Sequence, residues 1–229
     1  MSVIFWDFDG TLAYSDSLWS RSVYKALLET DPYAQVKYEE IRSHMSYGFT
    51  WHTPELDYTH LLLDKWWNFM NKHFYESYLK CGVSKEIALA AVSKIRGIVK
   101  KVENYTLYSD TMDTLCTVKE MGYTNVILSN NYPDLDETLE KLEIIQYFDG
   151  VIVSAAEGYD KPRIELFHLA KKRFPDNEYY MVGDNPVADI AGGKNANMKT
   201  ILVHKEYSEN ADYCFSDLYS ICSILRKIN

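Results

Sequence analysis

Residues 3–12 have the sequence VIFWDFDGTL, which predicts a buried strand that ends in a polar turn. The run 3–6 is apolar and rich in β-forming residues, and it stops abruptly at Asp7. Asp7 and Asp9 stand two positions apart, so in locally extended backbone both carboxylates project to the same side. One carboxylate can attack a substrate as a nucleophile while the other transfers a proton. Two carboxylates this close ionise together at low cost only around a cation, which favours Mg²⁺.

The rest of the chain alternates between helical segments and short apolar runs. Residues 18–103 have apolar residues at three- and four-residue spacing, which is typical of helices. Four short apolar runs follow, separated by helical sequence, and this alternation indicates parallel β-α-β units. We therefore predict an α/β fold, a doubly wound parallel sheet with an inserted all-helical cap domain. The core domain is placed at 1–13 and 105–229, and the cap domain at 14–104. The four runs are 125–128, 150–153, 179–182 and 200–203.

The composition indicates a globular protein with a small substrate. The 229 residues are 47% apolar and 25% charged, and 24 Lys and Arg against 33 Asp and Glu give a net charge of −9. With no concentrated basic run, we expect neither nucleic acid nor a membrane surface as partner. The four cysteines lack metal-binding spacing, and the N-terminus lacks a signal-like region. We expect a cytoplasmic protein with reduced, mostly buried thiols. No pattern indicates its oligomeric state.

Polar groups also follow the later apolar runs. Ser129-Asn130-Asn131 brings a hydroxyl and backbone N–H groups to the sheet edge, where they suit phosphate oxygens, although an ordinary helix cap has the same composition. Further along, Pro162 suits the first position of a helix, and the preceding Lys161 is a candidate to face the site, although a lone lysine at such a place is more often solvated surface.

The last of these groups supplies further oxygen ligands. Asp184 and Asp189 follow the run 179–182 and suit a hard cation, although an acidic loop would look alike. In the first turn, Gly10 permits a tight bend and Thr11 adds a hydroxyl donor. Because the carboxyl ends of parallel strands meet at one edge, we expect all these groups to gather there.

Together these motifs resemble the haloacid dehalogenase-like (HAD-like) hydrolase superfamily, in the phosphatase type whose helical cap is inserted between the first and second motifs. The resemblance covers residues 1–13 and about 105–205. The matching motifs are Asp7-Phe8-Asp9-Gly10-Thr11-Leu12, Ser129-Asn130, Gly158 with Lys161-Pro162, and Gly183-Asp184-Asn185 with Asp189-Ile190 and Lys194-Asn195-Ala196.

The resemblance implies a Mg²⁺-dependent phosphatase that hydrolyses a small phosphorylated metabolite through an aspartyl-phosphate intermediate. Asp7 would be the nucleophile and Asp9 the general acid and base, with the Asp9 main-chain carbonyl as a further metal ligand. Lys161 and Ser129 would hold the transferred phosphoryl group. The implied metal ligands are Asp7, Asp9, Asp184 and Asp189, with Asp189 in a supporting role, and the core residues assigned to catalysis or substrate binding are Asp7, Asp9, Thr11, Ser129, Asn130 and Lys161.

Three other functions are weighed against this one. A phosphomutase would share the whole core and differ in transferring phosphate between sugar phosphates. By the resemblance, a dehalogenase would need neither a metal nor the carboxylate of Asp9. A non-catalytic binding module would be free to lose the nucleophile or a metal ligand, and here neither is missing.

The predicted cap contains one candidate recognition segment, residues 47–52, in which aromatic and hydrogen-bonding groups cluster. A lid over the strand ends would contact the leaving group, so Trp51 and His52 are assigned to substrate binding. The alternative is that Trp51 only packs between cap helices.

Two positions depart from the family pattern. Ser109-Asp110 stands near the presumed hinge, where Pro-Gly is common, and Asn197 stands where a glycine often precedes the last strand. Asn tolerates the left-handed conformation, so Asn197 is expected to adopt it.

Overall fold

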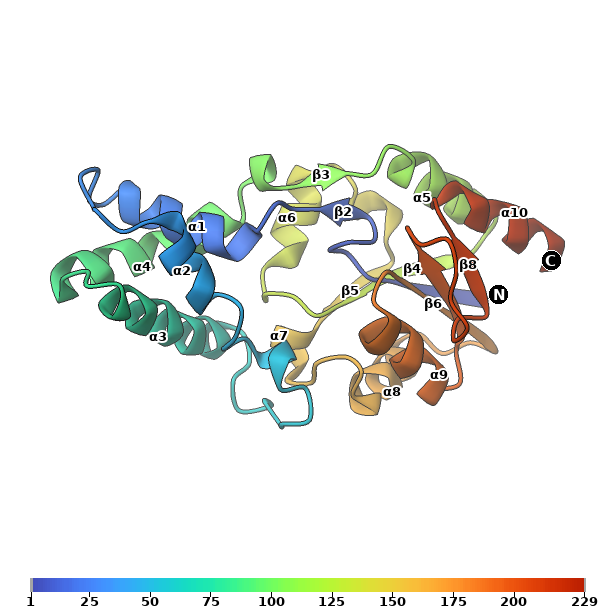
Figure 1. The fold of residues 1–229 in the computed structure, drawn as a ribbon. Coiled ribbons are helices and arrows are strands. Elements are labelled where there is room, and N and C mark those ends of the chain that lie inside the picture. The colour runs from blue at the N-terminus through green and yellow to red at the C-terminus, as the bar shows by residue number, and fades with distance from the viewer. Residues whose placement is uncertain (1, 229) are drawn as a thin grey trace.

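The computed structural model describes residues 2–228 and contains a six-stranded sheet with helices on both faces (Figure 1). The strand order is β5-β4-β1-β6-β7-β8, and every neighbouring pair is parallel. The doubly wound α/β prediction is confirmed. The last strand was not predicted, because it has only three residues. The strands are β1 (Ser2–Trp6), β4 (Thr124–Ser129), β5 (Gly150–Val153), β6 (Glu178–Gly183), β7 (Lys199–Val203) and β8 (Tyr213–Phe215).

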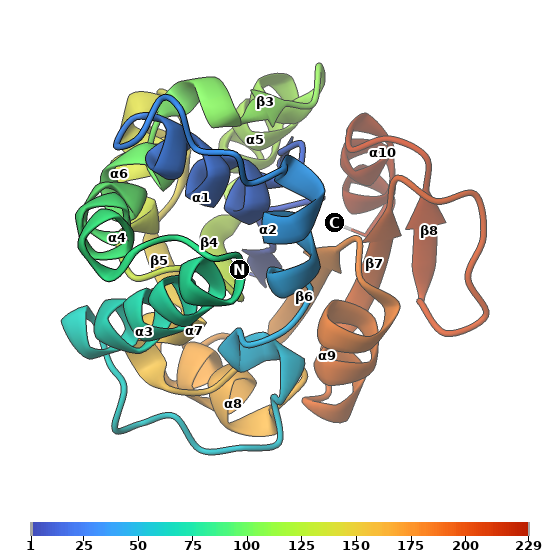
Figure 2. The ribbon, with the colours of Figure 1, turned by 60° about the vertical axis from the view of Figure 1, so that its left-hand side comes forward.

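Successive residues of β1 pack on opposite faces of the sheet. Helices cover both faces, with α5 and α8 on opposite sides (Figure 2). Ile4 and Trp6 join a core that includes α5, α6 and α10, whereas Val3 and Phe5 pack against α8. Burial on both faces explains why the strand reads as one continuous apolar run. The core helices are α5 (Thr111–Glu120), α6 (Leu135–Lys141), α7 (Ser154–Glu157), α8 (Ile164–Arg173), α9 (Gly192–Asn195) and α10 (Tyr219–Ile228), with single turns η3 (Ile145–Tyr147) and η4 (Pro186–Ala191).

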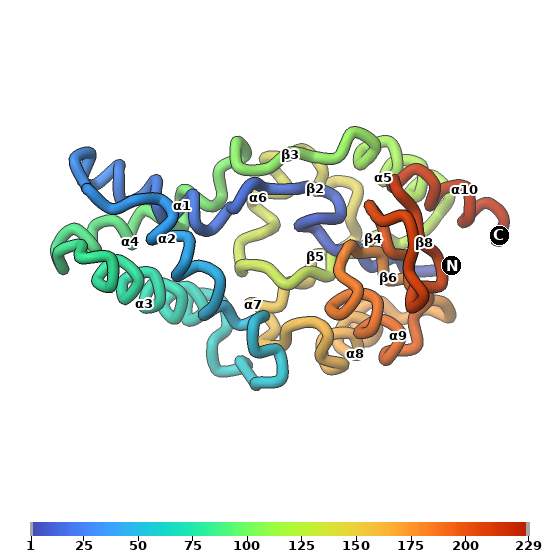
Figure 3. Tube along the Cα trace, in the orientation of Figure 1, coloured from blue at the N-terminus to red at the C-terminus, as the bar shows by residue number. Residues whose placement is uncertain are grey.

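Between β1 and β4 the chain leaves the sheet and returns through a short antiparallel ladder. Ala13 pairs with Leu107 and Tyr14 with Thr106, so the two connecting segments run side by side (Figure 3). The segment between them, which we call the insertion, forms a helical body beside the sheet. Its elements are α1 (Leu18–Leu28), α2 (Tyr38–His44), η1 (Thr50–His52), α3 (Asp64–Lys80), α4 (Lys85–Val99) and η2 (Val102–Asn104), and the ladder strands are β2 (Ala13–Tyr14) and β3 (Thr106–Leu107).

The insertion contacts the core at Asp134, just before α6. The Asp134 carboxylate accepts hydrogen bonds from Trp67 Nε1 at 3.0 Å and from Arg96 Nε at 2.7 Å, and Lys100 Nζ lies 3.5 Å away. All three partners belong to α3 or to the α4 region. One core carboxylate therefore holds both long helices of the insertion.

A second contact joins the loop between η1 and α3 to the segment around α7. Tyr58 N donates to Gly158 O at 3.0 Å, and Leu63 N donates to Ala155 O at 3.1 Å. Gly158 has φ +80°, and a Cβ there would lie 2.4 Å from the Thr59 Cα. Both the backbone conformation and this close approach therefore require glycine.

Three local predictions can be compared with the structure. Asn197 has φ +54°, so its left-handed conformation is confirmed. The prediction that Pro162 opens a helix is wrong, since α8 begins at Ile164 after the N-cap Arg163. The thiols are not mostly buried: Cys222 is, whereas the other three cysteines are partly exposed. Within residues 2–228, no helix has both the length and the apolar character needed to span a membrane.

The departure at Ser109-Asp110 has a structural explanation. The Asp110 carboxylate accepts hydrogen bonds from Leu218 N at 2.8 Å and from Tyr219 N at 3.1 Å, at the start of α10. Free N–H groups at a helix start are stabilised by such an acceptor, and the negative charge suits the helix dipole. A glycine at position 110 would leave these groups without that acceptor.

Candidate active site

The nucleophile candidate lies where β1 ends beside β6. Asp7 N donates to Val182 O at 2.9 Å, which continues the pairing of the two strands by one residue. The chain then turns, with Leu12 N bonded to Phe8 O at 2.9 Å. Asp184 directly follows β6, so the carboxyl ends of two adjacent strands bring Asp7 and Asp184 together, as predicted for a parallel sheet.

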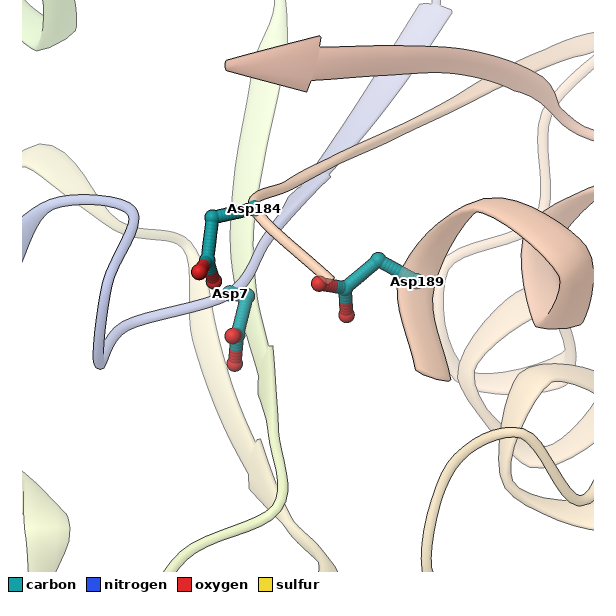
Figure 4. A group of neighbouring side chains, drawn as sticks. All are labelled: Asp7, Asp184 and Asp189. Carbon is teal, nitrogen blue, oxygen red and sulfur yellow. The ribbon is translucent and has the colours of Figure 1, made fainter. Parts of the chain in front are cut away.

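Three carboxylates meet at this edge. Oxygen atoms of Asp7, Asp184 and Asp189 all lie within 4.8 Å of one another (Figure 4). Burial, and then the charge of Asp7, raise the pKa of Asp184. Burial and Asp7 likewise raise the pKa of Asp9 to about 7. A divalent cation would relieve this repulsion, and an all-oxygen donor set suits Mg²⁺.

Gly10 makes the close approach of the first turn to Asp184 possible. It has φ +83°, and a Cβ at this position would lie 2.7 Å from the Asp184 carboxyl carbon. The next residue, Thr11, is fully buried, and its hydroxyl lies 3.5 Å from Asp184 Oδ1. The structure therefore places Thr11 against the carboxylate of Asp184.

Lys161 is the buried cation of the site, with 2% of its surface exposed. Its ammonium donates to Leu128 O at 2.8 Å and to Asp189 Oδ1 at 2.6 Å, and it lies 2.9 Å from Asp7 Oδ1. These three acceptors use all three of its hydrogens. Burial lowers the pKa of Lys161, but the charges of Asp189 and Asp7 outweigh it and hold the pKa above its ordinary value.

Asp189 is fully buried and serves first as the partner of Lys161. Its second oxygen accepts a hydrogen bond from Asn185 N at 3.0 Å, so both oxygens already have donors. Burial raises the pKa of Asp189, and the Lys161 ammonium opposes that effect. This geometry suits the supporting role assigned to Asp189 better than direct metal ligation.

The end of β4 and the residue after it differ in their contacts: Ser129 has an unpaired hydroxyl, and Asn130 is a positioning group. Ser129 Oγ is buried without a hydrogen-bond partner among residues 2–228, and Ser129 lines the cavity at Asp7. The Asn130 side chain instead binds the backbone of Lys161: Nδ2 donates to Lys161 O at 2.9 Å, and Oδ1 accepts from Lys161 N at 2.7 Å. Asn130 therefore positions Lys161.

Asn131 is a site residue that sequence reasoning did not assign. Its Nδ2 donates to Asp9 Oδ2 at 2.8 Å, while its Oδ1 accepts from Tyr132 N at 3.0 Å. The Asp9 carboxyl is thus held in one orientation. The sequence did contain a signal for Asn131, which is the third of the polar residues that follow the apolar run 125–128.

Two aromatic residues hold the backbone of the first turn. His204 Nε2 lies 2.8 Å from Thr11 O, and the Tyr108 hydroxyl donates to Gly10 O at 3.4 Å. The two rings stack with centroids 3.7 Å apart. His204 and Thr11 are 193 positions apart in the sequence, so no local pattern could have indicated this contact.

Two adjoining cavities surround these groups. One, of about 360 Å³, is lined by the core residues of the site, and the other, of about 450 Å³, extends under the insertion. Asp9, Asn130 and Trp51 line both. Trp51 stacks on Phe49 with ring centroids 4.6 Å apart, whereas His52 is exposed and packs edge-on against Phe49. Trp51 thus lines the site, whereas His52 lines neither cavity.

The comparisons with known proteins agree with this geometry. Residues 1–197 match the family model of the haloacid dehalogenase-like hydrolases, and the chain belongs to this family. A glyceraldehyde 3-phosphate phosphatase of Pyrococcus furiosus is 34% identical over 51% of this chain and 53% of its own length. A phosphoserine phosphatase of Thermus thermophilus is 32% identical over 44% of this chain and 42% of its own length. The chain spans about half the length of the curated relatives it matches.

Solved structures share the whole architecture. A HAD phosphatase from Thermococcus onnurineus has a TM-score of 0.68 at 22% identity, over 98% of each chain. A 2-haloacid dehalogenase from Pseudomonas syringae has a TM-score of 0.74 at 17% identity, over 100% of each chain. Because a phosphatase and a dehalogenase both have this fold, the fold does not choose between their activities.

Proposed function

We propose that this protein is a phosphoric monoester hydrolase that acts on a small phosphorylated metabolite. The observation that carries the proposal is the contact of Lys161 with Asp7, at a cavity that Asp9, Asp184 and Ser129 also line. One cavity thus brings together a nucleophile (Asp7), a cation (Lys161), an acid (Asp9) and an unpaired hydroxyl (Ser129). A dehalogenase would have no use for the carboxylates of Asp9 and Asp184, which supports the phosphatase.

In the first step, an oxygen of the Asp7 carboxylate attacks phosphorus and forms an acyl phosphate. The ester P–O bond breaks, and its electron pair goes to the leaving oxygen, which takes the proton of the Asp9 carboxyl. The raised pKa of Asp9 suits this role, because the carboxyl then holds a proton near neutral pH. Lys161 through its charge, and Ser129 through its unpaired hydroxyl, stabilise the phosphoryl oxygens.

In the second step, water attacks the same phosphorus atom. Asp9, now ionised, takes a proton from the water, and the bond between phosphorus and the Asp7 oxygen breaks. Phosphate leaves, and both carboxyl groups return to their starting states. Asn131 keeps the Asp9 carboxyl in one orientation through both proton transfers.

Asp7, Asp184 and the main-chain carbonyl of Asp9 would hold Mg²⁺, with Asp189 supporting them through Lys161. When bound, the ion supplies positive charge against the phosphoryl oxygens. We also propose residues 14–104 as a cap domain that closes over the strand ends, with Trp51 facing the leaving group; His52, assigned with it from the sequence, lines neither cavity.

The proposed activity is tested by incubating the purified protein and Mg²⁺ with a panel of phosphate monoesters. The panel includes glyceraldehyde 3-phosphate and phosphoserine, after the relatives' names. We expect released inorganic phosphate with at least one ester. If phosphate appears only on a second sugar, the protein is a mutase. If no ester loses phosphate, the proposal is wrong.

Removal of the metal should abolish activity, and Mg²⁺ should restore it. The reason is that Asp7 and Asp184 offer only oxygen donors and repel each other without a cation. Ca²⁺ should inhibit, because its higher coordination number lets Asp7 bind through both oxygens and spoils the line of attack. Phosphate release is measured after chelation and after adding back each ion. Full activity with Ca²⁺ alone would contradict this metal site.

Trp51→Ala should lower kcat/KM for the metabolite ester by about 10-fold or more and largely spare p-nitrophenyl phosphate. The activated leaving group of that artificial ester depends less on contacts made by the insertion. His52→Ala serves as the matched comparison, and we expect the smaller effect from it because His52 is exposed and lines neither cavity. Both activities and the melting temperature are measured for each variant. Equal losses toward both esters with a lowered melting temperature would show that Trp51 only packs.

A further inference from the structure

The cavity under the insertion contains an unpaired cation. Arg42 of α2 lines it and is exposed, and its guanidinium forms no ion pair with a carboxylate of residues 2–228. Four of the six arginines of the chain do form such pairs: Arg21, Arg96, Arg163 and Arg173. In a chain with net charge −9, an arginine left free beside the catalytic cavity marks a place for an anion.

The other groups that line this cavity support that interpretation. Among the described lining residues, Asp9 is the one carboxylate, and it gives its proton to the leaving oxygen. Trp19 and Trp51 supply apolar walls. The remaining polar side chains on the insertion side are uncharged serines: Ser15, Ser17, Ser20 and Ser46. Of the insertion residues that line this cavity, none is negatively charged, and no carboxylate of residues 2–228 forms an ion pair with Arg42.

Another hollow, which none of the core site residues line and which we call the outer hollow, provides a contrast. It is larger, about 810 Å³, and Arg21 and Lys25 line it. There the cations are already neutralised: Arg21 pairs with Asp16, and Lys25 Nζ lies 3.0 Å from Glu103 Oε1. That hollow therefore offers no free positive charge, whereas the cavity next to Asp9 does.

We propose that the natural substrate carries a second anionic group on its leaving alcohol, a carboxylate or another phosphate, which the guanidinium of Arg42 binds. This inference rests on the proposed phosphatase function and adds the substrate class. A cavity of about 450 Å³ suits a small metabolite. The planar guanidinium fork matches both kinds of anion with two hydrogen bonds.

The test compares pairs of esters that differ only in the second charge. For the carboxylate the pair is 3-phosphoglycerate against glyceraldehyde 3-phosphate, and for the phosphate it is ribulose 1,5-bisphosphate against ribulose 5-phosphate. We expect the wild-type protein to prefer the anionic member of one pair, which identifies the group. Arg42→Gln should then reduce kcat/KM for that ester by about 10- to 100-fold and leave its partner nearly unchanged. Arg42→Lys should retain part of the preference, because it keeps the charge but loses the fork.

Arg21→Gln is the matched control, since Arg21 lies in the outer hollow and should not affect either ester. p-Nitrophenyl phosphate, which has no second anionic group, separates the hypothesis of phosphatase activity from the hypothesis of an anion site at Arg42. If it is hydrolysed while neither pair shows a preference, or while Arg42→Gln lowers kcat/KM for both members of a pair equally, the anion site is refuted and the phosphatase stands. If no ester at all is hydrolysed, both the phosphatase function and the anion site are refuted.

Discussion

Asp7→Asn is expected to reduce phosphatase activity by at least about 1,000-fold, because the amide has nearly the shape of the carboxylate but cannot attack phosphorus. The fold should survive. An amide oxygen can still accept from Lys161, which lies 2.9 Å from the Asp7 carboxylate in the wild-type protein. The measurements are steady-state phosphate release and the melting temperature.

The control for this variant is Asp113→Asn, which makes the same chemical change at an exposed position on α5. It should keep full activity and shows whether expression or purification alone lowers the rate. A folded Asp7→Asn protein that retains more than a few per cent of wild-type activity would show that the covalent mechanism is wrong.

Lys161→Met is expected to have the second largest effect, on stability as well as on rate. The substitution leaves the carboxylates of Asp7 and Asp189 without their buried cation, and breaking a buried ion pair costs about 3–5 kcal/mol. Activity should fall by about 100-fold or more, since a group that stabilises the phosphoryl oxygens is lost. Denaturant unfolding in metal-free buffer measures the free energy of unfolding.

The stability loss of Lys161→Met should depend on pH. Without the ammonium, burial and the charge of Asp7 raise the pKa of Asp189 in the folded state, and only the hydrogen bond from Asn185 N opposes them. Folded protein then binds a proton that unfolded protein has released, so stability is gained below the folded-state pKa and lost as the pH rises through it. The deficit should therefore be larger at about pH 8 than at about pH 5.5.

A double variant separates the buried charge from the catalytic role. Lys161→Met with Asp189→Asn removes both members of the pair, and Asn can still accept a hydrogen bond from Asn185 N. We expect part of the lost stability to return and the activity to stay low. If the double variant is no more stable than Lys161→Met, the buried charge of Asp189 is not the source of the instability.

Much of the fold could be predicted because β1, β4, β5, β6 and β7 are buried strands, which read as apolar runs. β2 and β3 have two residues each, and β8 is only partly buried, so none of them has a periodic pattern long enough to recognise. The helix at Pro162 was misjudged because a proline that suits a helix start also suits the turn before one.

The site was predictable where a residue ends a strand or directly follows it. Asp7, Ser129 and Asp184 reach one edge because parallel strands end there, and this needs no knowledge of side-chain contacts. The functions of Asn130 and His204 depend on which groups the tertiary fold brings close to them, Lys161 in one case and Thr11 in the other. Such long-range contacts leave no periodic signal in the sequence.

The ladder between β2 and β3 also affects how new specificities can arise. It fixes both ends of the insertion at one place, with Ala13 opposite Leu107 and Tyr14 opposite Thr106. When the ends of a segment are already held together, lengthening or replacing it adds little closure entropy to the core. We therefore expect the helical segment to behave as a module that evolution can exchange, and a protein engineer can replace, while the residues at the strand ends keep their geometry.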